Sequence, residues 1–261
     1  ITSKTKAIVP VSLNGRNVIS KELIEISKSN NIWIIEDAAQ GMLAPRPYDL
    51  INSEITNYCR TYSFSMAKMI TTGQGGMVLT NSEDFSNELR SRRTHGIENV
   101  SDVNNWERLG LNYRMSDVLA SVGINQVKRI KQKKDQYLKI YEYYKNIINH
   151  EHLKLIPVNI SAGEVPIYIE ALWNNREYYV NALREKNIET RTFYPDINDA
   201  SYISNKKQTL EKTIFSKIEA CIYHIQQLPR FFLITRIIIL RNPKYRFFNS
   251  FVQNSIHKRP F

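Results

Sequence analysis

Residues 32–40 read Ile-Trp-Ile-Ile-Glu-Asp-Ala-Ala-Gln, and this stretch decides the fold class. The apolar run over 32–35 is continuous rather than alternating, which is typical of a strand that a sheet buries on both faces. Charge appears only where the run ends, at Glu36 and Asp37. In parallel α/β sheets, ligands bind beyond the carboxyl ends of the strands. The stretch therefore predicts a buried strand that carries Asp37 to the edge of a binding site.

Strands and helices alternate on both sides of this stretch. We predict strands over 7–11, 61–64 and 77–80, and helices over 20–30, with Ser20 as its N-cap, and over 83–93. This order favours a mostly parallel sheet flanked by helices. Pro10 argues against a central position for the first strand, because proline cannot donate a ladder hydrogen bond.

A long helix is predicted over 116–148, with Ser116 as its N-cap. Its basic run over 128–134 is predicted to be a solvated helix face. After residue 150 the pattern changes to shorter elements, which are strands over 153–158 and 167–172 and a helix over 175–186.

The fold class predicted from this pattern is α/β, in three parts. They are a partial large domain with a mostly parallel sheet (1–145), a smaller α+β C-terminal domain (146–229), and a basic, aromatic tail without a clear period (230–261).

The composition excludes several classes of protein. Of the 261 residues, 42% are hydrophobic, which is enough for a folded core rather than a disordered chain. Two cysteines cannot build a disulfide framework. No apolar run reaches the roughly 18 residues of a membrane-spanning helix, and the start of the chain lacks the layout of a signal peptide. We therefore expect a cytoplasmic protein.

The net charge of +11 is concentrated near the C-terminus. Seven basic residues and no acidic one lie beyond residue 219, namely Arg230, Arg236, Arg241, Lys244, Arg246, Lys258 and Arg259. Such a tail can bind nucleic acid or an anionic membrane, but it says little about the rest of the chain.

One lysine lies in a loop that favours reactivity. Lys68 follows the predicted strand at 61–64 and precedes the glycine-rich segment 71–76. If the loop partly excludes water, the pKa of the amine falls, and a neutral amine can form a Schiff base. The ordinary alternative, which the pattern alone favours, is a solvated and inert lysine.

Asp37 and Gln40 each have two interpretations. Asp37 either balances a cationic ligand or caps a helix that begins at Ala38, and the pattern alone favours the cap. Gln40 either completes that cap or faces the same ligand. Other chemistries have less support, because the sequence shows no metal-ligand spacing, no Walker or G-x-G-x-x-G loop, and no convincing pair of His95 with Cys59.

Six motifs occur in a fixed order along the chain. They are Ile-Ile-Glu-Asp-Ala-Ala-Gln (34–40), Ser-Phe-Ser-Met-Ala-Lys (63–68), Gly-Gln-Gly-Gly (73–76), His-Gly (95–96), Gly-Leu-Asn-Tyr-Arg-Met (110–115) and Ala-Ser-Val-Gly-Ile-Asn-Gln (120–126). In this order and spacing they resemble the sugar-nucleotide aminotransferases of the DegT/StrS group. Those proteins are pyridoxal-phosphate enzymes of the aspartate-aminotransferase fold type. The resemblance runs from about residue 5 to about residue 228 and is densest before residue 130.

The resemblance implies roles for five side chains. Lys68 would bind pyridoxal phosphate covalently and then move a proton between substrate and cofactor. Asp37 would pair with the pyridinium nitrogen, and Gln40 would hydrogen-bond the phenolic oxygen. Ser63 would contact the phosphate. Asn112 would reach the phosphate of the neighbouring subunit's cofactor in a homodimer, although without the resemblance it would be interpreted as part of a turn.

The implied reaction is amino transfer, usually from glutamate, to a keto group of a nucleotide-linked deoxysugar. Its usual context is the biosynthesis of surface polysaccharides or glycans. Dehydratases of the same group carry histidine in place of the lysine, so Lys68 argues against that branch. The expected partners are the nucleotide-linked keto-sugar and the amino-acid donor, with no nucleic acid and no membrane span.

Two departures from the family pattern leave alternatives open. The family's first part, about 100 residues with a phosphate-binding turn, is not in this sequence. After Leu228 and Pro229, the basic tail takes the place of a short final helix. We therefore carry three hypotheses: a piece of an aminotransferase, a non-catalytic remnant of one, or a basic binding module that acts through its tail.

Overall fold

The structure is a computed structural model, and it describes residues 1–45, 57–99, 101–102, 104–106, 108–151, 153–173, 176–192 and 220–223. The chain divides into two compact units. The first comprises Ile1–Tyr141 and Pro157–Ile167, and the second comprises Glu142–Ile156 and Tyr168–Phe261. The predicted tail over 230–261 lies outside the described residues.

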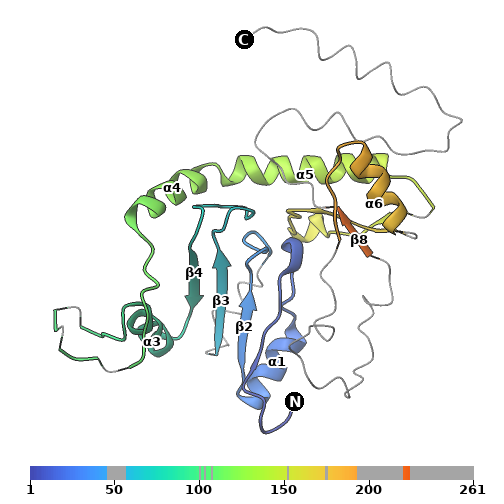
Figure 1. The fold of residues 1–261 in the computed structure, drawn as a ribbon. Helices are drawn as coiled ribbons and strands as arrows, with labels where there is room; N and C mark the ends of the chain where they lie inside the picture. The colour runs from blue at the N-terminus through green and yellow to red at the C-terminus, as the bar shows by residue number, and fades with distance from the viewer. Residues whose placement is uncertain are drawn as a thin grey trace, which may run out of the picture. The chain divides into compact units, whose positions relative to one another are not determined.

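The first unit is built on a four-stranded sheet in the order β1-β2-β3-β4. Its strands are β1 (Ala7–Ile8), β2 (Trp33–Asp37), β3 (Tyr58–Ser63) and β4 (Gly76–Thr80). The first three are parallel, which confirms the predicted mostly parallel sheet. Figure 1 shows β4 running against β3, and the ladder between them is antiparallel. The loop over 64–75 contains no helix. A parallel arrangement of β3 and β4 would need a longer crossover connection, usually one that contains a helix.

β1 is shorter than the strand predicted over 7–11, because Pro10 has no N–H to extend the ladder. The chain nevertheless continues alongside β2. The Asp37 N–H donates to the Pro10 carbonyl over 2.9 Å, and the Ser12 N–H donates to the Asp37 carbonyl over 2.9 Å. The backbone of Asp37 is therefore held on the β1 side of the sheet.

Two predicted helix starts are confirmed at their caps. The helix α1 (Lys21–Asn30) begins after Ser20, whose Oγ accepts from the Leu23 N–H over 3.2 Å. The helix α4 (Asp117–Lys128) begins after Ser116, whose Oγ accepts from the Leu119 N–H over 3.4 Å. Each side-chain oxygen satisfies a backbone donor that the first turn leaves unpaired.

The single long helix predicted over 116–148 is instead two helices, α4 and α5 (Ile130–Ile147), which are separated at Arg129. The predicted helix over 83–93 is α3 (Glu83–Arg93). Two short 3-10 helices are η1 (Leu13–Gly15) and η2 (Ile160–Ala162). In the part of the chain that is described, no helix combines the length and the apolar character needed to cross a membrane.

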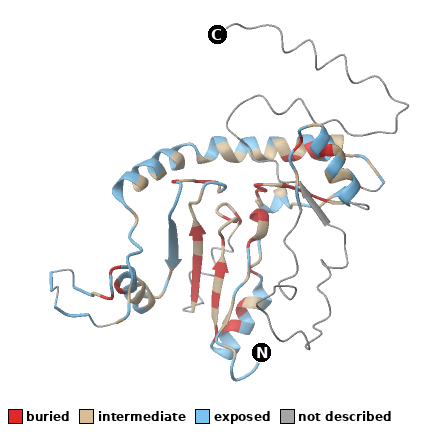
Figure 2. Ribbon diagram, viewed as in Figure 1, coloured by how far each residue is buried: buried red, intermediate tan, exposed pale blue. Residues whose placement is uncertain are grey.

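The core of the first unit lies on β2 and β3. Ile34 and Tyr58 pack with Ile19 and Ile24, so that α1 covers one face of the sheet. Figure 2 shows buried positions along β2 and β3, whereas β4 is exposed along nearly its whole length. The apolar side chains of Met77, Val78 and Leu79 are all exposed in this chain.

The second unit contains a smaller antiparallel sheet in the order β5-β6-β8-β7. Its elements are β5 (Leu153–Leu155), β6 (Ile169–Trp173), the helix α6 (Arg176–Glu185), β7 (Arg191–Thr192) and β8 (Ala220–Tyr223). Its core cluster consists of Leu153, Ala171, Leu183 and Ile188. Both predicted strands of this region are present: the strand predicted over 153–158 is shortened to β5, and the strand predicted over 167–172 is shifted to β6.

Candidate active site

The register of β2 and β3 brings two of the expected site residues to one edge of the sheet. Asp37 is the last residue of β2 and lies opposite Thr61 in the parallel ladder. Ser63 is the last residue of β3, two positions further on. Successive side chains of a strand alternate between faces, so Thr61 and Ser63 belong to the same face. The carboxyl ends of β2 and β3 thus place a carboxylate and hydroxyl groups along one edge.

Asp37 closes a turn rather than a helix. Its Oδ1 accepts a hydrogen bond from the Ala39 N–H over 3.0 Å, and no helix begins at Ala38. The interpretation of Asp37 as a helix N-cap is therefore wrong. The Ala38 N–H instead donates to the Thr61 carbonyl over 2.9 Å, which ties the turn to β3. The side chain of Asp37 is half-buried at this turn.

Gln40 uses its carbonyl oxygen within the protein. Its Oε1 accepts from the Asn14 N–H over 3.0 Å, so it does not complete a helix cap. This bond assigns the orientation of the amide and leaves the NH₂ group as the donor. Asn14 is itself fixed, because its Oδ1 accepts from the Ile167 N–H over 2.8 Å. Gln40 can therefore present N–H donors to a group bound beside Asp37.

The loop that carries Lys68 is held at several backbone positions. The Lys68 N–H donates to the Ser65 carbonyl over 3.1 Å, and the Thr72 N–H donates to the Phe64 carbonyl over 2.9 Å. The Lys68 side chain is half-buried, and Met69 after it is buried. Lys68 therefore lies on a compact turn at the end of β3, not on an open, fully solvated loop.

Ser65 is a further candidate site residue that the sequence pattern did not single out. The Ser63 hydroxyl lies 3.2 Å from the Ser65 hydroxyl, and Ser63 Oγ accepts from the Ser65 N–H over 3.3 Å. Two hydroxyl groups therefore stand together where β3 ends. The Ser-x-Ser spacing was visible in the sequence and could have suggested the pair, since alternate residues of a strand share a face.

Asn112 lies in a different segment from the other candidates. It forms an antiparallel bridge with Thr94, just beyond α3, rather than with β2 or β3. Its side chain is exposed, and its Oδ1 accepts from the Arg114 side-chain Nε over 3.3 Å. Among the five expected site residues, Asp37, Ser63 and Lys68 are thus carried by the ends of β2 and β3, with Gln40 three residues beyond Asp37.

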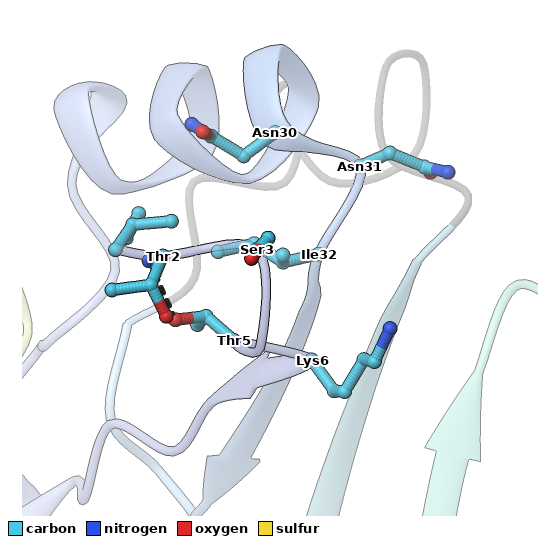
Figure 3. Close-up of a pocket in the computed structure, with 8 residues that line it drawn as sticks. Thr2, Ser3, Thr5, Lys6, Asn30, Asn31 and Ile32 are labelled. Carbon is cyan, nitrogen blue, oxygen red and sulfur yellow. Dashed lines mark hydrogen bonds between the residues drawn. The ribbon is translucent and has the colours of Figure 1, made fainter.

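A polar, open pocket of about 500 Å³ lies elsewhere in the first unit (Figure 3). Its lining includes Thr2, Lys6, Asn31 and Ile32, and the Thr2 N–H donates to Thr5 Oγ1 over 3.0 Å. Asn31 and Ile32 come just before β2, whereas Asp37 is the last residue of that strand. The pocket therefore lies at the amino end of β2 and is separate from the Asp37 edge.

A metal centre has no support in the described part of the chain, where no three His, Cys, Asp or Glu side chains come together as ligands. The functional groups at the Asp37 edge are instead a carboxylate, a primary amide, two hydroxyls and an amine. These groups suit an organic ligand that has cationic, anionic and electrophilic parts.

The chain belongs to the DegT/DnrJ/EryC1/StrS aminotransferase family, whose model matches residues 1–235. This confirms the resemblance found in the motifs, and the family is one of pyridoxal-phosphate-dependent aminotransferases.

Two curated relatives illustrate the match. The chain is 32% identical over 208 residues to a GDP-perosamine synthase of Escherichia coli O157:H7, which covers 75% of this chain and 54% of that protein. It is 28% identical over 198 residues to the putative pyridoxal phosphate-dependent aminotransferase EpsN of Bacillus subtilis, which covers 74% of this chain and 50% of that protein. The chain spans about half the length of the curated relatives it matches.

The fold is similar to that of NtdA from Bacillus subtilis, a crystal structure with its cofactor PMP bound. The TM-score is 0.69 at 22% sequence identity, with 89% of this chain and 54% of that chain covered. The mixed α/β architecture expected from the sequence is therefore that of an aminotransferase fold.

Proposed function

We propose that the protein of which this chain is a part transfers an amino group, with glutamate as donor, to a keto group of a nucleotide-linked deoxysugar. Pyridoxal phosphate is the proposed cofactor, and surface polysaccharide or glycan biosynthesis is the proposed context. Family membership supports the reaction type, and the name of the GDP-perosamine synthase relative supports the substrate class. The observation that carries the proposal is that Asp37, Ser63 and Lys68 come from the carboxyl ends of two paired parallel strands.

The functional groups at this edge fit the proposed cofactor one by one. The Asp37 carboxylate suits a protonated ring nitrogen, and the NH₂ of Gln40 suits a phenolic oxygen. The hydroxyls of Ser63 and Ser65 suit phosphate oxygens. The amine of Lys68 suits an aldehyde carbon. The fit supports pyridoxal phosphate over a metal ion as the group held here.

In the proposed mechanism, the bound cofactor supplies an electrophilic carbon and a ring that accepts electrons from the substrate. Lys68 would hold the cofactor covalently, and its amine, once free, would move a proton at the reacting substrate carbon. Asp37 would keep the ring nitrogen protonated by opposite charge. Gln40 and Ser63 orient the ring and the phosphate.

Asn112 is proposed to act in a second subunit. Its exposed position outside the β2 and β3 edge is compatible with a side chain that completes a neighbouring subunit's site. The proposed assembly is accordingly a homodimer.

Reduction with borohydride in the presence of pyridoxal phosphate tests the proposal. We expect a visible absorption band from the chain and, after reduction and peptide mapping, a modified Lys68. Lys68→Ala should abolish this label, whereas Lys131→Ala, which changes an exposed lysine of α5, should keep it. Labelling that persists in Lys68→Ala or scatters over surface lysines would contradict the assigned role. A chain that takes no label at all would mean that these residues alone do not assemble the cofactor site.

A further inference from the structure

Lys133 departs from the prediction that the basic run over 128–134 is a solvated helix face. Its side chain is half-buried. The Lys133 Nζ donates to the Met69 carbonyl over 3.0 Å and also to Gln126 Oε1. The prediction is wrong at this position because α5 turns this lysine toward a loop of the sheet, a contact between residues 64 positions apart.

The carbonyl that Lys133 contacts belongs to the residue that follows Lys68. Met69 is buried, and its carbonyl lies in the turn between the Lys68 N–H, bonded to Ser65, and the Thr72 N–H, bonded to Phe64. Lys133 therefore contacts the middle of a loop whose two ends are held by backbone hydrogen bonds.

A second contact joins the same helices to the same loop. A Cβ atom placed on Gly123 of α4 would lie 3.2 Å from Thr72 Cγ2, so the helix backbone passes close to the loop. Gln126, one turn further along α4, accepts from the Lys133 ammonium group. The junction of α4 and α5 thus packs directly on the Lys68 loop.

The contact removes part of the water around the Lys133 ammonium group, which a fully exposed lysine keeps. Burial, with a smaller contribution from the Arg129 charge, lowers the pKa of the Lys133 amine. A partly desolvated ammonium group is retained only where acceptors compensate for lost water. Two acceptors, the Met69 carbonyl and Gln126, do so here.

We propose that Lys133 is a positioning residue for Lys68, because its ammonium group fixes the Met69 carbonyl against Gln126 of α4 and so sets the backbone of the Lys68 loop. The role rests on the proposed function of Lys68. The proposal gives α5 a role in supporting the site, whereas none of the five expected site residues lies on that helix.

Amide hydrogen exchange of the 261-residue chain without cofactor tests whether the contact between Lys133 and the Met69 carbonyl, here called the tether, holds the Lys68 loop. The Thr72 N–H reports on the loop, and the Asp37 N–H, bonded to Pro10, reports on the sheet. In Lys133→Met, we expect exchange at Thr72 to be about tenfold faster, the effect of losing a hydrogen bond from a charged group. Lys133→Arg should restore most of the protection, and the control Lys131→Met should exchange like the unmodified chain.

Two results would overturn the proposal. One is exchange at Thr72 that stays unchanged in Lys133→Met. The other is equal acceleration at Thr72 and Asp37, which would mean a general loss of stability rather than a local tether.

Attachment of pyridoxal phosphate provides a second measurement. We expect the rate of borohydride-trapped labelling at Lys68 to fall about tenfold in Lys133→Met and to recover in Lys133→Arg. If the unmodified chain takes no label while the exchange rates respond as expected, the contact between Lys133 and the Met69 carbonyl stands, and cofactor attachment at Lys68 of this chain fails. If labelling at Lys68 is normal in Lys133→Met, the positioning role is wrong and the proposed function stands.

Discussion

Arg60 on β3 and Glu36 on β2 form a buried ion pair. The Arg60 Nε lies 3.4 Å from Glu36 Oε1, and the two side chains are 0% and 2% exposed. They are partners in the parallel ladder, immediately next to the pair of Asp37 and Thr61. Glu36 also accepts from the Ser12 hydroxyl, over 2.6 Å, and from the Tyr58 hydroxyl. A buried carboxylate with two hydroxyl donors and one ion-pair partner organises the strand end that carries Asp37.

Arg60 also reaches the segment that follows Gln40. Its Nη2 donates to the carbonyl of Gly41 and, over 3.3 Å, to that of Ala44. The guanidinium group therefore connects the β2 and β3 ladder with the chain that leaves the site. This connection explains why a strand interior tolerates a fully buried charge.

Replacing Arg60 should destabilise the chain strongly. Arg60→Met removes the donors to Gly41 and Ala44 and leaves Glu36 as a buried, unpaired charge. We expect a loss of about 3–5 kcal/mol in the free energy of unfolding, measured by urea unfolding. Arg92→Met, which breaks the exposed pair with Glu88, should cost no more than about 1 kcal/mol. Equal effects of the two variants would show that the buried pair does not organise the unit.

Gly96 should resist substitution far more than another glycine of similar backbone conformation. Gly96 has φ +84°, and a Cβ atom there would lie 1.7 Å from the Arg108 carbonyl oxygen. Gly73 has φ +82° with no atom within 4 Å of such a Cβ. We expect Gly73→Ala to cost about 1–2 kcal/mol from backbone strain alone. Gly96→Ala should cost several times more and displace the chain that leads to Asn112.

Urea unfolding of both variants, with exchange at the Leu111 N–H as a local reporter, checks this expectation. The Leu111 N–H donates to the Arg92 carbonyl over 2.9 Å, so it reads the same loop. Similar stability and protection in the two variants would mean that the close approach at Gly96 is absent in solution.

Removing the Asp37 carboxylate should separate cofactor attachment from turnover. In an active, full-length version of the protein, Asp37→Ala should still take pyridoxal phosphate on Lys68. Turnover should fall by at least about 100-fold, because no group then holds the proton on the ring nitrogen. Asp102→Ala, which changes an exposed carboxylate, is the control. Near-normal turnover in Asp37→Ala would reduce Asp37 to a residue that closes a turn.

The thiol of Cys59 should be unreactive until the chain unfolds. Cys59 is 2% exposed on β3, and burial raises the pKa of its thiol. The folded state thus disfavours the thiolate, so its stability is retained below the ordinary thiol pKa of about 8.5 and declines as the pH rises beyond it. With Cys221→Ser as background, labelling by a thiol reagent should be slow in buffer and rapid in denaturant. Fast labelling of the folded chain would contradict the burial.

Local sequence predicted several of the elements that surround the site, although the strand predicted over 61–64 begins earlier, as β3 at Tyr58–Ser63. The continuous apolar run before Asp37 gave β2, and the serines at positions 20 and 116 gave the starts of α1 and α4. Periodicity and capping act over a few residues, so they can be read from neighbouring positions alone. The predicted β1 was too long, because the pattern indicated apolar character past Pro10 but not the loss of the ladder there.

The sequence named candidate site residues, but it did not predict the hydrogen bonds that hold them. Asp37 and Lys68 follow predicted strands and Ser63 lies in one, and the motif order named the three together. Ser65 was not singled out. The helix-cap interpretation of Asp37 and Gln40, which for Asp37 the pattern alone favoured over ligand binding, was wrong, because their partners are the Ala39 N–H and the Asn14 N–H. A cap requires a helix, and whether a helix follows depends on what else competes for those donors.

The sequence by itself determined the class of this protein: a chain of alternating strands and helices with a lysine motif and a carboxylate motif at two strand ends. Only the tertiary structure decided that β4 runs antiparallel, that Arg60 meets Glu36, and that Lys133 contacts the Met69 carbonyl. These are contacts between residues distant in the chain. Their existence depends on strand register and helix direction, which follow from the packing of the whole unit rather than from any local pattern.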